Sequence, residues 1–451
     1  MKRSAALKAS VLLSLLFLSV YGGCNWVASH RTNVGSLFFA WERQIPFIPW
    51  MIVPYMSIDL FFVTAPFLCR GERELSLLAR RLTFAVLVAA VCFLLFPLRF
   101  AFERSHVSGW LGTIFNGFRM LDAPYNLVPS LHIAILATLA PVYLRRCQGI
   151  LRFGLIVWFG LIALSTLLTY QHHVVDVLGG AALAICGFYA FPEHETRLPV
   201  LQNPQIGSYY LAASALIAVT AVWFWPWGSL LLWPALSLAI VGSAYFGIGP
   251  GIFRKTEGRI PLSAGIMLHP CLLGQHLSLL YYRQQCRKWD EVVPGLLMGR
   301  KLTSHEANEA IRCGVTAVLD LTGEFSEASP FLAVKYLNIA VLDLTAPTQE
   351  QLAQMARFIA KHIESGKVYV HCKIGYSRSA AAVGAFLLTT GQIGNPAEVL
   401  ALLSRARPSL IVRPEVIEAL NCFARRTVKQ PVELACGEQM NENKVAHFET
   451  P

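Results

Sequence analysis

One segment of nine residues joins a thiol to basic and hydroxyl side chains in an order suited to phosphate chemistry. It reads His371-Cys372-Lys373-Ile374-Gly375-Tyr376-Ser377-Arg378-Ser379. A Cys372 thiolate would attack phosphorus, Arg378 would hold two phosphoryl oxygens, and Ser379 would help the sulfur leave. The backbone N–H groups that would cradle the oxygens belong to Lys373, Ile374, Gly375, Tyr376 and Ser377. The segment indicates cleavage of a phosphate ester through a phosphocysteine, without a cofactor or metal.

This chemistry needs a strand before the loop and a helix after it, because a helix N-terminus lowers the pKa of a thiol. Val368–His371 has the pattern of a strand, and Ser379–Thr389 that of a helix. Upstream, Thr316–Thr322 is predicted as a buried strand and Ala353–Ile363 as a helix. The alternation predicts an α/β domain over residues 286–430. A buried structural cysteine beside a helix-capping arginine is the alternative, and the strand–loop–helix context disfavours it.

The loop resembles the dual-specificity branch of the protein tyrosine phosphatase family, whose motif is His-Cys-x5-Arg-Ser/Thr. The resemblance covers about residues 286–428 and implies an aspartate some thirty residues before the cysteine, which protonates the leaving oxygen. Asp343 lies 29 residues upstream and fits that role, whereas Asp320, the rival, lies 52 residues upstream within a strand. The sequence after Cys372 is similar to family members that dephosphorylate phosphatidylglycerophosphate and other phospholipid headgroups, and Lys373 would add positive charge for such a substrate.

A second group of ionisable residues lies in the apolar half of the chain, at the ends of hydrophobic segments. His172 and Asp176 are four residues apart and share one helix face, so the carboxylate would orient His172 as a nucleophile. His132 would protonate the leaving alkoxide, while Ser130 and Arg99 would hold the phosphoryl oxygens. Such residues in a membrane segment are candidates for function, and no metal is required.

These residues resemble the type 2 phosphatidic acid phosphatase superfamily, closest to its inositol-phosphoceramide and sphingomyelin synthase branch. Pro129-Ser130-Leu131-His132 matches one motif, and His172 with Asp176 matches the next. Thr166 stands where many members have arginine, and Arg99 is a partial substitute for a missing upstream basic motif. The resemblance implies a lipid phosphatase or phosphotransferase domain, in a fusion typical of bacterial inner membranes. A relic that only recognises lipid is the alternative.

The composition explains how one chain holds both groups. Of 451 residues, 55% are hydrophobic and 14% are charged, whereas a soluble protein has about a quarter charged residues. A single water-soluble globule and a disordered chain are therefore excluded. A membrane helix needs about 20 apolar residues. The segments that qualify, or nearly so, are 7–22, 45–69, 82–98, 128–144, 153–170, 175–192, 208–226 and 229–250.

The predicted organisation is a polytopic all-α membrane domain of about eight transmembrane helices, followed by an α/β cysteine-dependent phosphatase domain. The domains are expected at 1–250 and 286–430, joined by a basic interfacial linker at 251–285 and followed by a polar tail at 431–451. The first apolar segment is interpreted as a retained helix rather than a signal peptide. Residues 261–282 are interpreted as a helix lying at the membrane interface, with a ninth span as the alternative.

Basic residues in the short loops predict the orientation. With the N-terminus in the cytoplasm, fourteen Lys and Arg residues, including Lys255, fall inside and five fall outside. This places Cys372 in the cytoplasm and His172 at the outer face of an inner or plasma membrane. The 11 cysteines suggest neither a disulfide framework nor a zinc site.

The sequence thus predicts a two-site membrane phosphatase that acts on phospholipids, with membrane phospholipids as partners. A membrane-tethered protein tyrosine phosphatase, with the apolar half as an anchor or lipid sensor, is the second hypothesis. Nucleic-acid binding is disfavoured, because the +11 charge lies mainly in loops between apolar segments.

Overall fold

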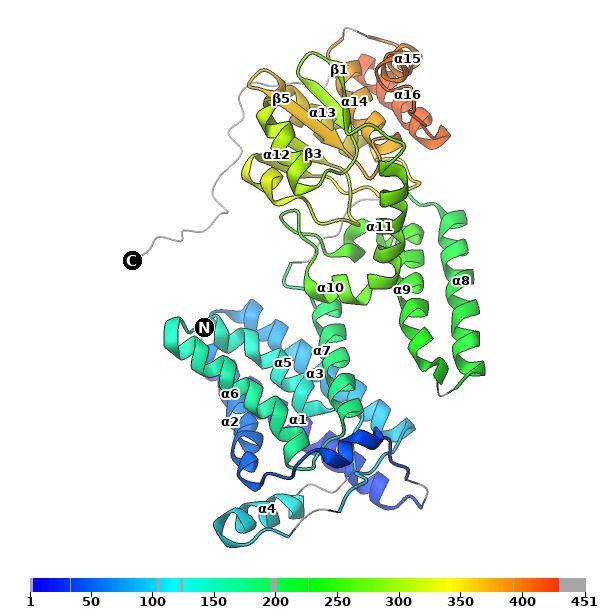
Figure 1. Ribbon diagram of the computed structural model, residues 1–451. Coiled ribbons are helices and arrows are strands. Elements are labelled where there is room, and N and C mark those ends of the chain that lie inside the picture. The colour runs from blue at the N-terminus through cyan, green and yellow to red at the C-terminus, as the bar shows by residue number, and fades with distance from the viewer. Residues whose placement is uncertain are drawn as a thin grey trace. The chain divides into compact units, whose positions relative to one another are not determined.

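The computed structural model describes residues 3–32, 34–103, 106–121, 125–194, 201–225, 227–391 and 393–429. They form two compact units that divide between Glu193 and His194 (Figure 1). The predicted first boundary lies after residue 250, whereas the structure groups the two helices before that residue with the second unit. The expected polar tail at 431–451 lies outside the described residues.

The first unit consists of helices joined by short connections. They are α1 (Arg3–Ser29), α2 (Ile52–Leu68), α3 (Glu72–Leu95), α4 (Gly109–Leu121), α5 (Leu131–Leu144), α6 (Gly149–Leu168) and α7 (Val174–Ala190), with the 3₁₀ turns η1 (Ala40–Gln44) and η2 (Pro49–Met51). Small residues such as Ala85, Ala89 and Ala134 are buried between α3 and α5 and allow the helices to approach closely. Helix α5 also packs against α7, which brings the N-terminal ends of these two helices, where the second group of polar residues lies, to one region.

Large apolar side chains also cover the outside of these helices. On α6, Ile150, Leu151 and Phe153 are 60–85% exposed. A helix that is apolar on all sides is typical of a membrane span. Among the described residues six helices are long and apolar enough to cross a membrane, and α5 and α7 are shorter apolar helices. Together these eight helices coincide with the eight predicted segments.

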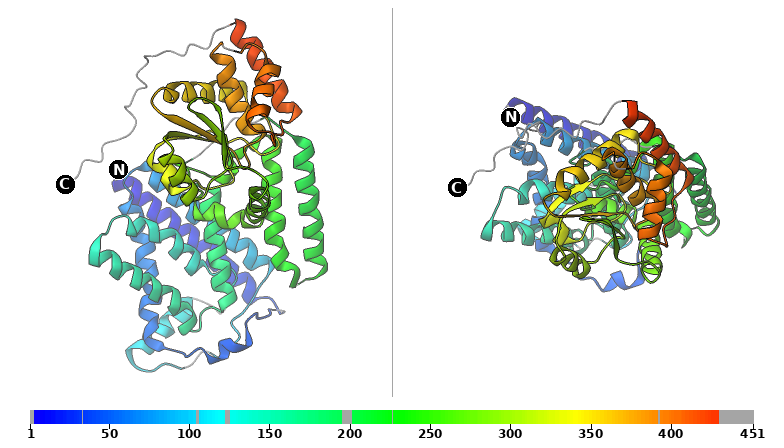
Figure 2. Two further views of the ribbon diagram at one scale, coloured as in Figure 1. Left: turned by 45° about the horizontal axis from the view of Figure 1, so that its top comes forward. Right: turned by 90° about the horizontal axis from the view of Figure 1, so that it is seen from above.

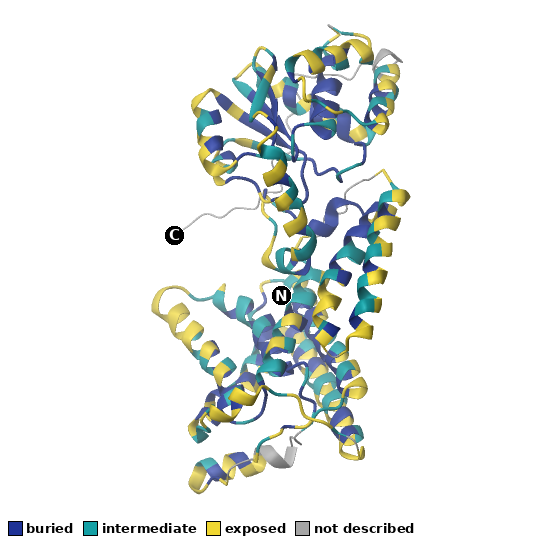
Figure 3. Cartoon of the chain, turned by 45° about the vertical axis from the view of Figure 1, so that its right-hand side comes forward, coloured by how far each residue is buried: buried dark blue, intermediate teal, exposed yellow. Residues whose placement is uncertain are grey.

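The second unit begins with a helical hairpin. Helix α8 (Pro204–Trp223) is followed by η3 (Trp227–Leu231), α9 (Leu232–Ser243) and a π-helical turn, η4 (Ala244–Ile248). Helices α8 and α9 run side by side (Figures 1 and 2), and Gly207 and Gly242 lie at their contact, where an added Cβ would meet the opposite helix at about 3 Å or less. Outward side chains such as Leu216 and Leu236 are exposed, and exposed residues recur along both helices (Figure 3).

The segment expected at the membrane interface contains two short helices, α10 (Leu262–Met267) and α11 (His269–Arg283), after the turn η5 (Pro250–Phe253). Neither α10 nor α11 is among the candidate spans. On α11, Leu273, Leu277 and Leu280 form an exposed apolar stripe, while Leu272 and Leu279 are buried on the other side. This two-sided character is typical of an interfacial helix.

The rest of the second unit is an α/β domain around a five-stranded sheet. The strands are β1 (Trp289–Val293), β2 (Leu296–Gly299), β3 (Val315–Asp320), β4 (Lys335–Asn338) and β5 (Lys367–His371), in the order β1-β2-β5-β3-β4. Only β1 is antiparallel to its neighbour. Strands β3 and β5 end in register at Asp320 and His371. The loop that follows β5 therefore leaves from the centre of the sheet, at the edge where the carboxyl ends of its neighbours also lie.

Successive side chains of β5 point to opposite faces of the sheet. Val368 and Val370 pack under α13 (Gln349–Ile363), α14 (Ser377–Thr389), α15 (Pro396–Ala406) and α16 (Pro414–Lys429). Tyr369 points to the opposite face, with α12 (Ser304–Arg312) and the turn η6 (Ser329–Ala333). Helix α14 is buried along nearly its whole length, which fixes the loop before it.

Lys255 does not lie where the sequence predicts it. It is predicted as a loop charge on the inner side of the membrane, but the structure buries it, and its ammonium contacts the Asp320 carboxylate of β3. It also donates to the Thr322 carbonyl at 3.0 Å. Lys255 therefore neutralises a buried carboxylate in the α/β domain and is not available to a membrane surface.

Lys255→Met is expected to lower the free energy of unfolding by about 3–5 kcal/mol, because it leaves Asp320 charged and buried without its cation. A loss of that size corresponds to roughly 2–4 °C in Tm per kcal/mol. Thermal unfolding of the detergent-solubilised chain measures it, with the exposed Lys361→Met as the matched control. Equal Tm values for the two variants would contradict the assigned role of Lys255.

Candidate active site

The loop between β5 and α14 is held open by its backbone and by contacts from outside it. Gly375 has a φ of +75°, and a Cβ there would meet the carbonyl of Gly299 at 2.5 Å, so glycine is required. The buried Arg407 donates to the Ile374 carbonyl at 3.0 Å, and the Lys301 N–H donates to the Lys373 carbonyl at 3.1 Å. With these carbonyls bonded outward, the loop can present N–H groups to a phosphate.

Cys372 lies at the base of this loop and is only 3% exposed. Burial by itself raises the pKa of the Cys372 thiol. The positive charge of Arg378, the Ser379 hydroxyl and backbone N–H groups of the turn act in the other direction and bring the pKa below its usual value. The structure thus favours a thiolate at the position where the sequence predicts the nucleophile.

Ser379→Ala is expected to raise the pKa of Cys372, because it removes a hydrogen bond that favours the thiolate. Alkylation of Cys372 by iodoacetamide, followed by mass spectrometry as a function of pH, measures it; the midpoint should move to higher pH. Ser377→Ala is the matched control, since the Ser377 hydroxyl donates to the Ile411 carbonyl. An identical midpoint in Ser379→Ala and wild type would refute the role of this hydroxyl.

Arg378 is fixed by an acidic residue that the sequence analysis missed. Its two terminal nitrogens donate to the Glu324 carboxylate at 2.7 and 3.2 Å, and it also donates to the Val341 carbonyl at 2.9 Å. Both side chains are 3% exposed. Glu324 follows the end of β3, the neighbour of β5, so it reaches the loop only through the strand order. A fixed guanidinium is suited to bind phosphoryl oxygens without reorganising.

Of the two aspartates considered as the general acid, Asp343 is the one that the structure brings to the loop. One of its oxygens lies 3.3 Å from Arg378 Nη2, the other lies 4.0 Å from Lys373 Nζ, and the side chain is one-third exposed. Asp320 is fully buried and accepts hydrogen bonds from Tyr336, Thr322 and Lys255. The geometry therefore favours Asp343 over Asp320 as the group that can reach a leaving oxygen.

Lys373 has a partner from outside the α/β domain. Its ammonium donates to Gln275 Oε1 of α11 at 2.8 Å, and the side chain is 9% exposed. Burial lowers the pKa of Lys373, while Asp343 and Glu324 oppose that effect. Gln275 belongs to the segment interpreted as interfacial, and nothing in the spacing of the sequence connected it with the loop.

Three buried side chains beside the loop are of the kinds that can ligate a metal ion. Atoms of Asp320, Glu327 and His371 lie within 4.8 Å of one another. Lys255 contacts Asp320 and Lys301 lies 3.5 Å from Glu327, so ammonium groups already balance both carboxylates. Burial opposes a charged His371, but the two carboxylates raise its pKa. We interpret this cluster as an internal ion network that supports β3 and β5.

In the first unit, the structure brings together most of the predicted membrane-site residues. His172 Nδ1 lies 3.4 Å from Asp176 Oδ2, and the two rings of His172 and His132 lie 6.2 Å apart between centroids. Ser130 is the N-cap of α5, and its N–H donates to the Asp176 carbonyl at 2.9 Å. His132 stacks on Tyr55 at 4.1 Å. Nucleophile, orienting carboxylate and acid candidates therefore lie at one place.

Among the residues that the structure describes, no hydrogen bond or ion pair brings Arg99 to this cluster. Its side chain is exposed, and within the described ranges its recorded hydrogen bond is the one from its backbone N–H to the Gly35 carbonyl. His173 is instead fully buried, with Nδ1 2.9 Å from the Glu42 carboxylate and Nε2 accepting from the Ala101 N–H. His173 thus holds the connecting segments together, and both of its ring nitrogens already have partners.

Known proteins resemble both units. Residues 297–426 match the family described as "Dual specificity phosphatase, catalytic domain". The human "Dual specificity protein phosphatase 26" is 34% identical over 166 residues, which are 35% of this chain and 77% of that protein. The chain belongs to the dual specificity phosphatase family. This dual specificity phosphatase also contains a PAP2-superfamily domain, matched over residues 50–190. Both matches support a phosphoric monoester hydrolase.

Other relatives of this dual specificity phosphatase are matched over shorter stretches. The rat "Dual specificity protein phosphatase 26" is 34% identical, over 27% of this chain and 61% of the relative. The human "Phosphatidylglycerophosphatase and protein-tyrosine phosphatase 1" is 33% identical, over 21% of this chain and 48% of the relative. The chain therefore spans less than two thirds of these two proteins.

Solved structures are similar to about a third of this dual specificity phosphatase. "Crystal structure of Tk-PTP in the active form" is 26% identical, covers 31% of this chain and 97% of that one, and has a TM-score of 0.29. "Crystal Structure of PTPMT1 in complex with PI(5)P" is 22% identical, with 32% and 98% covered and a TM-score of 0.30.

Proposed function

We propose that this chain is an integral membrane enzyme whose second unit hydrolyses a phosphomonoester on phospholipid headgroups. The observation that carries the proposal is the convergence of Cys372, Arg378 and Asp343 in the same compact unit as the apolar α8–α9 hairpin. A catalytic loop that folds with membrane-type helices works where lipids are found. The name of one relative, a phosphatidylglycerophosphatase, supports the same class of substrate.

The reaction begins when the Cys372 thiolate attacks phosphorus and the bond from phosphorus to the ester oxygen breaks. Asp343 gives its proton to the leaving alkoxide, while Arg378 and the N–H groups of the loop stabilise the equatorial oxygens. Water then attacks the phosphocysteine, Asp343 accepts its proton, and the Cys372 thiolate leaves with help from Ser379. The products are an alcohol on the lipid headgroup and inorganic phosphate.

The proposed topology follows the basic residues and the span helices. The N-terminus and the second unit's catalytic loop lie in the cytoplasm, and the His172 cluster faces the outside or the periplasm. Four tryptophans, Trp223, Trp225, Trp227 and Trp233, gather around the turn of the α8–α9 hairpin. Tryptophan is enriched where a membrane helix meets the interface, which supports a hairpin that enters the bilayer turn first.

The first unit is proposed to act on a lipid phosphate through a phosphohistidine. His172 attacks phosphorus, His132 protonates the leaving alkoxide, Asp176 orients His172, and water or a second lipid hydroxyl then accepts the phosphoryl group. The pairing of His172 with Asp176 supports this role. The exposed Arg99 does not, so the phosphoryl oxygens are assigned to Ser130 and the backbone around it.

The proposal for the second unit is tested by comparing kcat/KM of the purified chain for a short-chain phospholipid with a terminal phosphomonoester and for a phosphotyrosine peptide. We expect the lipid to be preferred at least tenfold. A preference for the peptide would instead support the membrane-tethered protein phosphatase, with the apolar helices as an anchor.

The first unit is tested in a background that carries Cys372→Ser, so that only its own site can act. Residual release or transfer of phosphate from lipid should disappear with His172→Ala and persist with His30→Ala, an exposed histidine in the same unit. Activity that survives His172→Ala would leave this unit as a lipid-recognising scaffold.

A further inference from the structure

We infer that the α8–α9 hairpin and α11 form a binding site for the glycerol and proximal acyl part of the substrate, next to the catalytic loop. The inference rests on the proposed function of the second unit and specifies how a lipid would reach that site. It assigns a binding role to helices outside the matched phosphatase region, which begins at residue 297.

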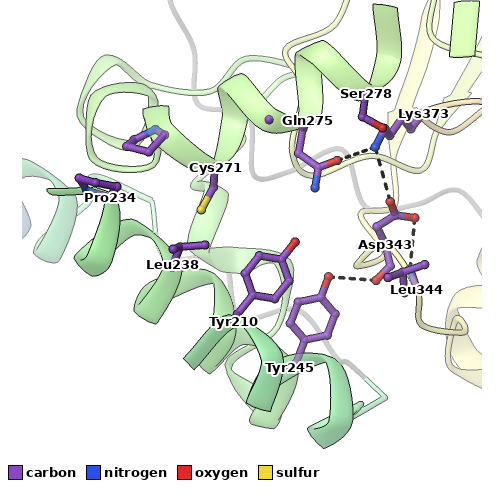
Figure 4. Close-up of a pocket in the computed structure, with 12 residues that line it drawn as sticks. Tyr210, Pro234, Leu238, Tyr245, Cys271, Gln275, Ser278, Asp343, Leu344 and Lys373 are labelled. Atoms are coloured by element: carbon purple, nitrogen blue, oxygen red, sulfur yellow. Dashed lines mark hydrogen bonds and ion pairs between the residues drawn. The ribbon is translucent and has the colours of Figure 1, made fainter. Parts of the chain in front are cut away.

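The site is a pocket of about 500 Å³ whose wall is shared between the helices and the catalytic edge (Figure 4). This volume is within the range of small-molecule sites, and suits a headgroup backbone with the first carbons of its chains. The lining residues are Tyr210, Pro234, Leu238, Tyr245, Pro270, Cys271, Gly274, Gln275, Ser278, Asp343, Leu344 and Lys373. Nine of these residues, from 210 to 278, precede the matched region, and three belong to it.

The two ends of the pocket differ in chemistry. Gln275, Ser278, Asp343 and Lys373 gather at one end, and Figure 4 shows them opposite the apolar group of Pro234, Leu238 and Cys271. Because Asp343 contacts Arg378, the polar end adjoins the groups that would hold the phosphate. A phospholipid monoester has the same sequence of parts, a polyanionic phosphate followed by a polar backbone and apolar chains.

The hairpin is bonded to the loop that carries the acid. The Tyr245 hydroxyl donates to the Asp343 carbonyl at 3.0 Å, and Asn203 Nδ2 donates to the Leu344 carbonyl at 2.9 Å. Leu344 has a φ of +61°, so this loop has a defined and unusual backbone conformation. These bonds fix the apolar wall at a set position relative to Asp343, as a substrate site requires.

The outer surface of the same helices explains how a lipid would enter. Leu273 and Leu277 of α11 are 48% and 58% exposed. These side chains suit a bilayer and its interface. An acyl chain would therefore pass from lipid to the wall formed by Leu238 without crossing water, while its phosphate reaches Lys373.

The test uses Leu238→Trp in the full chain, with Leu236→Trp on the outer side of α9 as the matched control. The substrates are glycerol 3-phosphate, which has no acyl chain, and a dioctanoyl phospholipid with a terminal phosphomonoester in mixed micelles. We expect Leu238→Trp to lower the ratio of kcat/KM for the lipid to kcat/KM for glycerol 3-phosphate about tenfold or more, and Leu236→Trp to preserve the wild-type ratio.

Cys271→Phe narrows the same pocket from α11 and should lower the ratio in the same direction, which keeps the test decisive if Leu238→Trp does not fold. A ratio equal to wild type in both pocket variants overturns the inference. So does an equal fall for both substrates, which would show an effect on the catalytic loop alone. A wild-type enzyme that hydrolyses glycerol 3-phosphate as well as the lipid would instead refute the proposed lipid preference itself.

Discussion

Replacing Cys372 by serine is expected to lower kcat for phosphomonoesters at the second unit by about 10⁴-fold or more. A serine hydroxyl is not ionised at neutral pH, so the Arg378 charge and the N–H groups that favour a Cys372 thiolate have no anion to stabilise. Substrate binding should be retained, because the groups that hold the phosphoryl oxygens are unchanged. Steady-state release of phosphate and the Kd for a lipid phosphate provide the two measurements.

Cys313→Ser is the matched control for this substitution, since Cys313 is exposed on the same α/β domain. It should leave kcat at the wild-type value. Phosphate release by Cys372→Ser that continues at a similar rate, and that is not removed by adding His172→Ala, would disprove the assignment of the catalytic loop. A loss confined to Cys372→Ser would also give the background needed to study the first unit.

Arg378→Lys is expected to lower kcat by about 10²–10³-fold, although the positive charge remains. Lysine has no planar fork, so it cannot bind two phosphoryl oxygens as guanidinium does, nor retain both bonds to Glu324. Because Glu324 is 3% exposed, part of its pairing would be lost in the folded enzyme. We expect inhibition by vanadate, which imitates the transferred phosphoryl group, to weaken in parallel with kcat.

Arg405→Lys on the exposed side of α15 is the comparison variant and should change neither kcat nor the inhibition constant of vanadate. If kcat fell only twofold in Arg378→Lys, the positive charge alone would be sufficient. Bidentate binding of the phosphoryl oxygens would then not be part of the mechanism. A fall in stability without a fall in kcat would assign Arg378 to the fold only.

The sequence was sufficient for much of the local structure. The predicted strands and helices around the loop are β3, α13, β5 and α14, with ends shifted by a few residues. Hydrophobic period and the Cys-x5-Arg spacing are local properties, so they can be recognised in one chain. The eight apolar segments were found for the same reason, since a membrane span is defined by length and composition.

Contacts set by tertiary structure were not predictable in this way. Glu324 reaches Arg378 because β3 lies beside β5, and the order of strands is not written in their hydrophobic pattern. Gln275 reaches Lys373 across 98 residues. Lys255 has the type and location of a loop charge, and only its ion pair with Asp320 shows that it belongs to the interior.

The buried ion pair of Lys255 and Asp320 also shows that the part of the chain that matches the phosphatase family begins later than the part that folds with it. A fragment that begins at residue 286 would contain the entire catalytic loop but would leave Asp320 without its cation and Lys373 without Gln275. The part of the chain that resembles a free-standing phosphatase is thus smaller than the part that folds as a unit. Activity measured on such an excised fragment would describe a different enzyme, with an open side where the membrane-type helices belong.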